Sequence, residues 1–213
     1  MSATCPLNSR RGRFPCLLPL LLAAALLAGC AGATPPVLDR PQEDLLAAKA
    51  DKRLAAEVRK GERDAFALIA VFRRDVFLGQ SYMLERSSIP ILDELGNAAL
   101  LLVRPTEVLP LLSDPSVVKA AWFGPQGRLA RLDPSLELDL LDRFGKGTEG
   151  KERLILARYR SVPEAKEVKA AESAGFKVVS RTGPNLVLSG PISGIPALLT
   201  DEWVVYLEKG FLP

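Results

Sequence analysis

The chain has 213 residues, with 28 basic and 25 acidic side chains and a formal net charge of +3. Residues 1–29 contain three arginines and no acidic residue, so the rest of the chain has 25 residues of each sign and gives no support for nucleic-acid binding. The sequence contains no histidine, which excludes His-based catalytic triads, Cys–His pairs and most zinc sites.

The N-terminal stretch has the layout of a secretory signal peptide. Arg10, Arg11 and Arg13 precede an apolar run from Leu17 to Ala28. This run is too short to span a bilayer as a stable helix, and it ends in small residues, as a signal peptide does before its cleavage site. We therefore expect residues 1–29 to be removed.

The end of this stretch also carries a more specific motif. Leu27-Ala28-Gly29-Cys30 resembles the lipobox of bacterial lipoproteins. The resemblance implies that the Cys30 thiol receives a diacylglyceryl group, that the chain is cut before Cys30, and that the new amino group is acylated. Ala31 stands where lipoproteins kept in the inner membrane usually carry Asp, so the resemblance implies an outer-membrane lipoprotein of the cell envelope that faces the periplasm. The alternative is an ordinary signal peptide with a chance cysteine.

A tether and a helix are expected after this cysteine. Residues 30–41 are small and proline-rich, which is typical of a tether. Residues 42–62 are predicted to form an N-terminal helix that stops near Gly61. Its apolar stripe consists of Leu46, Ala50, Leu54 and Val58. A solvated helix packed lightly on the body and a partner-binding helix are both compatible with so narrow a stripe.

The rest of the chain contains an internal duplication at an offset of 87 residues. Leu111–Val118 (LLSDPSVV) matches Leu198–Val205 (LLTDEWVV), and Leu68–Arg73 (LIAVFR) matches Ile155–Arg160 (ILARYR) without a gap. The match predicts an α+β protein with two tandem ferredoxin-like βαββαβ units. These are a first unit at residues 64–124 and a second unit at residues 151–213.

The elements of both units follow from apolar runs and from the glycine and proline residues between them. In the first unit the expected order is strand 65–72, helix 76–84, strands 89–92 and 98–103, helix 106–112 and strand 117–123. In the second unit it is strand 154–159, helix 162–174, strands 176–180 and 185–188, helix 195–199 and strand 203–208. Residues 125–150 are expected to link the units, with a helix at 133–144 and a flexible segment at 145–150. Units of this size are marginal alone, so we expect each bare sheet face to be covered by the other unit or by a partner.

The second unit resembles the inhibitor-type propeptides of subtilisin-like proteases. In that family a short helix and an acidic turn lead into a last strand with a V-x-x-V-E pattern. Here Leu198-Leu199-Thr200-Asp201 leads into Val204-Val205-Tyr206-Leu207-Glu208, and the likeness covers residues 151–213. It implies a free-standing module with the same βαββαβ fold that inhibits such a protease or helps it to fold.

Few side chains offer catalytic chemistry. Asp139 and Asp142, with Glu137, could form a carboxylate pair, but the leucines between them favour a solvated helix edge. Arg73 and Arg160 are equivalent and could bind an anion, although such residues at strand ends are usually surface charges.

Two further pairs of equivalent residues are candidates for packing, contact or turns. Asp114 and Asp201 each follow a short helix and suit a turn. Trp122 and Trp203 are expected in the core or at its rim, with an interface anchor as the alternative.

The expected function is therefore non-enzymatic. We expect a lipoprotein with no cofactor and no metal, attached to the membrane through Cys30 and acting as a periplasmic protein-interaction module that does not bind nucleic acid. Residues proposed for partner contact are Trp203, Tyr206, Glu208 and Phe211. The alternatives are the protease inhibitor or folding helper described above and a module that senses a small molecule or glycan between the two units.

Overall fold

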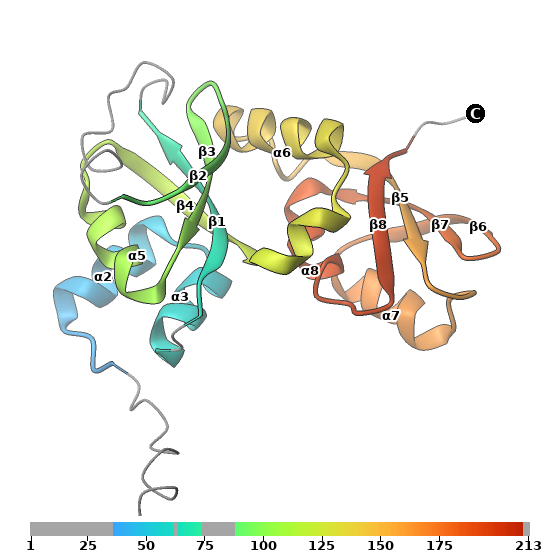
Figure 1. Cartoon of the computed structure of the whole chain (residues 1–213), viewed down its shortest axis with the longest axis horizontal. Helices are drawn as coiled ribbons and strands as arrows, with labels where there is room; N and C mark the ends of the chain where they lie inside the picture. The colour runs from blue at the N-terminus through green and yellow to red at the C-terminus, as the bar shows by residue number, and fades with distance from the viewer. Residues whose placement is uncertain (1–35, 62–63, 74–87, 211–213) are drawn as a thin grey trace, which may run out of the picture. The chain divides into compact units, whose positions relative to one another are not determined.

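The computed structural model describes residues 36–61, 64–73 and 88–210. The expected signal peptide, Cys30, the helix predicted at residues 76–84 and Phe211 lie outside the described residues. The described part is α+β, with two four-stranded antiparallel sheets that are each accompanied by helices (Figure 1). The prediction of an α+β fold with two sheets is confirmed.

Among residues 36–61, the structure has two helices where the sequence predicted one. They are α2 (Arg40–Lys49) and α3 (Lys52–Lys60). Ala50 is extended between them and forms a parallel bridge with Ala120, while the Asp51 amide donates to the Ala120 carbonyl at 3.0 Å. The expectation of a single helix over 42–62 is therefore wrong, because Ala50 pairs with the edge of a sheet that lies 70 residues away in the sequence.

The first sheet has the strand order β2-β3-β1-β4. Its strands are β1 (Phe66–Phe72), β2 (Ile91–Leu95), β3 (Ala98–Val103) and β4 (Val117–Pro125), and helix α5 (Pro105–Ser113) connects the last two. Gly96 has a φ of 60°, which glycine adopts without strain, and with Asn97 it forms the tight turn between β2 and β3.

The second sheet has the strand order β6-β7-β5-β8. In both units the second, third, first and fourth strands therefore follow one another across the sheet. Its strands are β5 (Glu152–Tyr159), β6 (Lys177–Thr182), β7 (Asn185–Pro191) and β8 (Val204–Lys209). Helix α7 (Ala165–Ser173) joins β5 to β6, and η4 (Ile192–Gly194) with α8 (Ile195–Leu198) joins β7 to β8. Helix α7 starts later than the predicted residue 162, because Glu164 and Glu167 form its capping box.

The registers of the two sheets agree pair by pair at the offset of 87. Leu68 pairs with Leu101 and Ile155 with Leu188. Each edge pairing also slips at the same place, so that Leu92 in β2 and Val179 in β6 are both bulged. Shared bulges support the duplication more strongly than shared apolar residues, since a bulge interrupts the ladder at one defined residue.

The equivalence extends to the helix before each unit. Between the sheets lie η3 (Gln126–Arg131) and α6 (Pro134–Lys146). Leu132 forms a parallel bridge with Leu207, and the Asp133 amide donates to the Leu207 carbonyl at 2.9 Å. This repeats the closure of β4 by Ala50 and Asp51, so α6 corresponds to α3 and is more than a linker. It also runs through Gly145 and ends at Gly147, so the flexible segment predicted at 145–150 is wrong in its first two residues.

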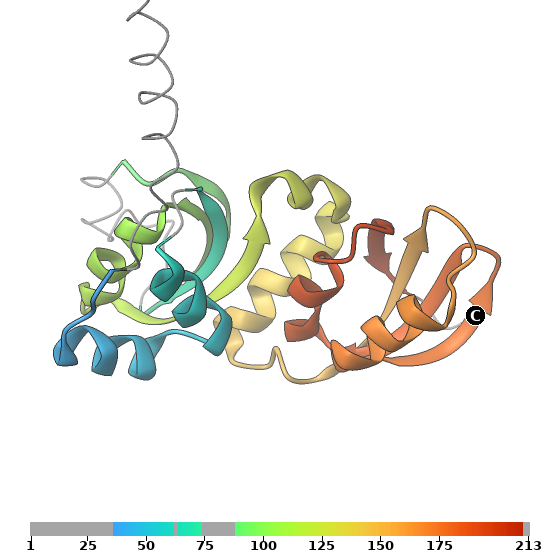
Figure 2. The same cartoon turned by 90° about the horizontal axis from the view of Figure 1, so that it is seen from below.

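Two buried clusters fill the described part. One lies between α2, α3, α5 and one face of the first sheet, and includes Leu54, Leu68 and Leu101. The other joins the opposite face of the first sheet to α6 and to the second sheet with α7 and α8, and includes Ile69, Leu140 and Ile155. Helix α6 therefore packs between structure from both units, and the units share one core (Figures 1 and 2).

Candidate functional site

The face of each sheet that does not carry the helices of its own unit is called here the rear face. In the first sheet it is formed by Ala67, Ile69, Val71, Ala98 and Leu100, which are all buried against α6 and its neighbours. The equivalent residues of the second sheet are Leu154, Leu156, Arg158, Asn185 and Val187. These side chains are half-buried or exposed, and the helices α7 and α8 pack on the opposite face.

Two of the four residues proposed for partner contact lie on this second rear face. Tyr206 pairs with Arg158 and Glu208 pairs with Leu156 across β5 and β8, and paired residues point to the same side of a sheet. Both side chains are half-buried. The Tyr206 hydroxyl donates to Asp133 Oδ2 at 3.0 Å, and this hydrogen bond, followed by burial, raises the pKa of Tyr206. The phenol is therefore a fixed, neutral donor at the rim of the face.

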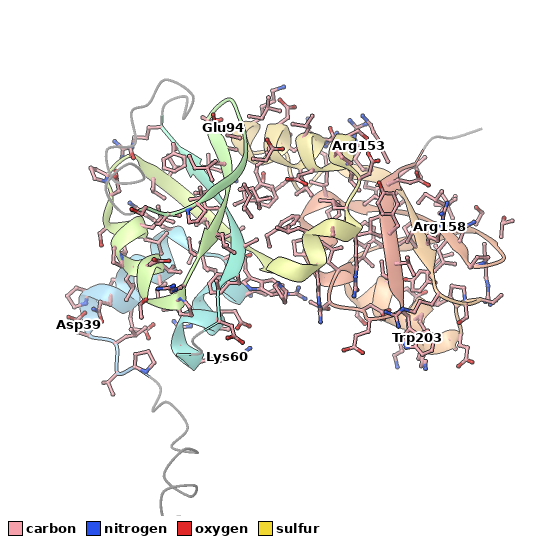
Figure 3. All side chains as sticks on the ribbon, viewed as in Figure 1. Asp39, Lys60, Glu94, Arg153, Arg158 and Trp203 are labelled. Atoms are coloured by element: carbon pink, nitrogen blue, oxygen red, sulfur yellow. The ribbon has the colours of Figure 1, made fainter. Side chains whose placement is uncertain are left out.

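Trp203 belongs to a different surface. It is 44% exposed just before β8, and the Lys166 ammonium lies 5.1 Å from the centre of its ring (Figure 3). A cleft of about 470 Å³ adjoins it, lined by Arg53, Lys166, Glu167, Thr200 and Asp201 among others. The structure therefore brings Tyr206 and Glu208 together and leaves Trp203 apart, at the mouth of this cleft.

The two carboxylates of the cleft, Glu167 and Asp201, accept hydrogen bonds from nearby backbone amides. Glu167 accepts the Glu164 amide at 2.9 Å, and Asp201 accepts the Trp203 amide at 2.9 Å. Asp114 accepts the Ser116 amide at 2.7 Å in the same way, so both repeated aspartates form turns, as predicted. Burial, followed by the charges of Asp201 and Glu167, raises the pKa of the nearby Tyr159 to about 12.

A second cleft of about 490 Å³ is lined by the end of α2 and the two residues after it, by β4, by α6 and the segment that follows it, and by η4 and α8. Lys119 crosses it to Glu149 at 2.5 Å and lies 5.4 Å from the centre of the Phe144 ring. Trp122 also lines it but is 9% exposed, and Arg53 lies over its ring, so this tryptophan is part of the core, as the sequence indicated.

The linker aspartates Asp139 and Asp142 form ion pairs with different basic side chains. Asp139 contacts Arg153 at 3.1 Å and Arg143 at 3.4 Å, whereas Asp142 pairs with Lys146 at 2.7 Å. Burial opposes ionisation of Asp139, but the hydrogen bond and the charges of the arginines outweigh it and lower its pKa. Arg153 reaches α6 from β5 (Figure 3), so Asp139 joins α6 to the second sheet.

The two arginines considered for anion binding lie at the surface. Arg73 and Arg160 are exposed at equivalent strand ends, and their backbone amides donate to Ser116 and Trp203. Within residues 36–61, 64–73 and 88–210, the structure has no group of three or more acidic or cysteine side chains that could hold a metal ion. None of the helices in the same ranges has the length and apolarity to cross a bilayer.

Comparison of the chain with protein-family models, with curated proteins and with solved structures finds no match. The protein is therefore described by the arrangement of its own sheets and helices. It is an α+β chain with two equivalent antiparallel sheets, one with its rear face buried and the other with its rear face uncovered by the described helices.

Proposed function

We propose that the chain is a lipoprotein, attached to the outer membrane by acyl chains on Cys30 and facing the periplasm. The motif Leu27-Ala28-Gly29-Cys30 and the following Ala31 support this location. The small, proline-rich residues 31–41 would tether the folded part to the lipid. Each buried methylene contributes about 0.8 kcal/mol, so two or three acyl chains suffice for stable attachment.

The folded part is proposed to be two ferredoxin-like βαββαβ units from an internal duplication. The shared strand order, the shared registers and the shared bulges support this origin. The closure of each last strand, by Ala50 in one case and Leu132 in the other, adds a feature of the repeat that precedes both units.

The proposed role is non-enzymatic binding of a protein in the periplasm. The observation that carries it is the rear face of the second sheet, where Leu154, Leu156 and Val187 are not covered as their equivalents in the first sheet are. The composition of this face supports protein contact, because tyrosine and arginine are enriched in interfaces and here flank an aliphatic centre. The charged candidates for catalysis, by contrast, are held in turns, caps and ion pairs.

Affinity purification tests this role. The full chain with a C-terminal tag is purified from solubilised envelope after mild crosslinking, beside a Cys30→Ser chain in the same cells. We expect one protein partner to copurify with the tagged chain, and to do so less with Cys30→Ser because the two proteins are no longer at the same membrane. Recovery of no specific partner from either chain would contradict the role.

Inhibition of a subtilisin-like protease is the second candidate. It is favoured by the position of Val204–Glu208, which resembles the family's V-x-x-V-E pattern, because β8 carries Glu208 on the rear face and follows the Asp201 turn. Residual subtilisin activity measured with the purified protein decides it, and full activity at micromolar protein would exclude inhibition.

Sensing of a small molecule is the third candidate, and it is favoured by the clefts beside Trp203 and Trp122. Titration with ligands while tryptophan emission is followed tests it.

A further inference from the structure

The molecule contains two copies of the same sheet face in two states. Ala67, Ile69 and Val71 in β1 correspond to Leu154, Leu156 and Arg158 in β5. The first set is buried in the core that contains α6, and the second is half-buried or exposed. The rear face of the first sheet therefore shows which kind of element packs on a face of this four-stranded sheet.

The element that covers the first copy is an amphipathic helix. Helix α6 contacts β1, β2 and β3, and its buried side chains are Leu136, Leu140, Leu141 and Phe144. Their spacing of four, one and three residues places them on one side of a helix. The second sheet has the same strand order and register, so its rear face offers equivalent positions to a helix with the same spacing.

The second rear face differs in a way that suits a separate partner. Its centre keeps the aliphatic residues Leu154, Leu156 and Val187, while Arg158 replaces Val71 and Asn185 replaces Ala98. Glu208 and Tyr206 lie on β8 at one side. A face with an apolar centre and a charged rim can stay in water until a partner arrives, whereas an entirely apolar face must remain buried.

A second copy of this chain does not supply the covering helix from the residues that the structure describes. Among the described helices, the one large apolar side chain that is exposed is Leu138 of α6. In α3, the equivalent of α6, Arg59 stands at the position of Leu141 and pairs with Glu43 at 2.5 Å. The outer side of that helix is therefore charged, and it would bring no apolar stripe to the face.

We propose that the rear face of the second sheet binds an amphipathic helix of a different envelope protein. This inference rests on the proposed protein-binding role and names the partner's structure. The partner helix packs aliphatic or aromatic residues, spaced as in α6, on Leu154, Leu156 and Val187. It places an acidic residue opposite Arg158 and a basic residue opposite Glu208, since unlike charges at a rim select the partner and its orientation.

Site-specific photocrosslinking in whole cells tests the proposal with the full chain. A photoreactive phenylalanine analogue replaces Ser180, which is exposed and pairs with Val187 on the rear face. The matched control carries the analogue at Val162, which is 53% exposed in the loop before α7. We expect position 180 to crosslink to an amphipathic helix of one envelope protein and position 162 not to do so.

Two further substitutions, made in the chain that carries the analogue at position 180, test whether the partner binds the rear face of the second sheet. Leu156→Arg and, separately, Arg158→Glu are each expected to lower the yield of crosslinking about tenfold, as hot-spot substitutions do. Arg158→Glu changes an exposed residue, so it keeps the test valid if Leu156→Arg fails to fold. Unchanged melting temperatures of the purified variants show that folding is intact.

The outcomes separate this proposal from the role on which it rests. Crosslinking to a second copy of this chain, to lipid or to a non-helical segment would overturn the proposal, as would equal yields in the variants. If position 180 gives no crosslink while affinity purification still returns a partner, the rear face is not the docking surface but the binding role stands. If neither experiment returns a protein, both fail.

Discussion

Replacing Leu140 by alanine tests whether the two units share one core. Leu140 is 1% exposed and belongs to the cluster that contains residues of both sheets. Truncation of a buried leucine to alanine costs about 3 kcal/mol, from the lost transfer energy and the cavity that remains. With a urea m-value of about 2 kcal/mol/M for a chain of this size, the midpoint should fall by about 1.5 M.

The assay is urea unfolding followed separately in each unit by tryptophan fluorescence. Trp203→Phe leaves Trp122 as the reporter of the first unit, and Trp122→Phe leaves Trp203 as the reporter of the second. Because Leu140 belongs to a core cluster that contains residues of both units, both reporters should shift together by the same amount. Leu138→Ala on the same helix is the control, since Leu138 is 43% exposed and its removal should change stability by less than about 0.5 kcal/mol.

Two results would contradict a core shared by the two units. One is a loss of less than about 1 kcal/mol for Leu140→Ala, which would mean that α6 is not packed as the structure has it. The other is a shift of only one reporter, which would mean that the units unfold independently.

Three further predictions concern single residues. Asp139→Asn should make the free energy of unfolding, measured with urea at several pH values, fall less steeply at acid pH. The lowered pKa of the Asp139 carboxyl gives stability that is present above about pH 4 and is lost as the pH falls through the folded-state pKa. An unchanged dependence at acid pH would contradict the ion pairs of Asp139. Gly194→Ala should lower the melting temperature by several degrees, because its Cβ would clash with the backbone oxygen of Ala174. Gly150→Ala meets nothing within 4 Å and should have little effect. The amides of Asp51 and Asp133 should be protected from hydrogen exchange to a similar degree because each donates to an edge strand, and fast exchange of either would show that its strand edge is open.

Local patterns were enough to predict most of the strands and the turns between them. Gly96 and Gly183, both with positive φ, stand between paired apolar runs at the same offset as the other repeated residues. The offset therefore predicted two sheets without any structure. The position of Tyr206 and Glu208 on one face also follows from strand alternation, because they are two residues apart.

The elements that were missed depend on contacts between distant residues. The apolar stripe of the N-terminal segment continues from Leu46 to Val58, and the one local sign of a new helix is Asp51, which caps α3 by accepting the Leu54 amide at 2.7 Å. The extended conformation of Ala50 accompanies its pairing with Ala120, which the apolar stripe does not predict. Helix α6 was predicted as part of a linker for the same reason, because its correspondence with α3 lies in the bridge of Leu132 and not in sequence identity.

The candidate surface was predicted only in part. Trp203, Tyr206 and Glu208 are proposed together for partner contact, but Trp203 precedes the strand and lies beside Lys166. The contrast between the two rear faces was present in the repeat, where Arg158 replaces Val71 and Asn185 replaces Ala98. The sequence alone did not indicate which of the two faces is buried, because the burial of the first depends on its packing against α6.

Mass spectrometry of the mature N-terminus tests the central claim, attachment of this scaffold to a membrane through Cys30, most directly. The full chain is expressed in cells, extracted with detergent and digested, and the mass of the N-terminal peptide is determined. We expect a peptide that begins at Cys30 and carries a diacylglyceryl group and an acylated amino group. A peptide that begins at Met1, or one that begins at or near residue 30 without lipid, would contradict the lipid anchor.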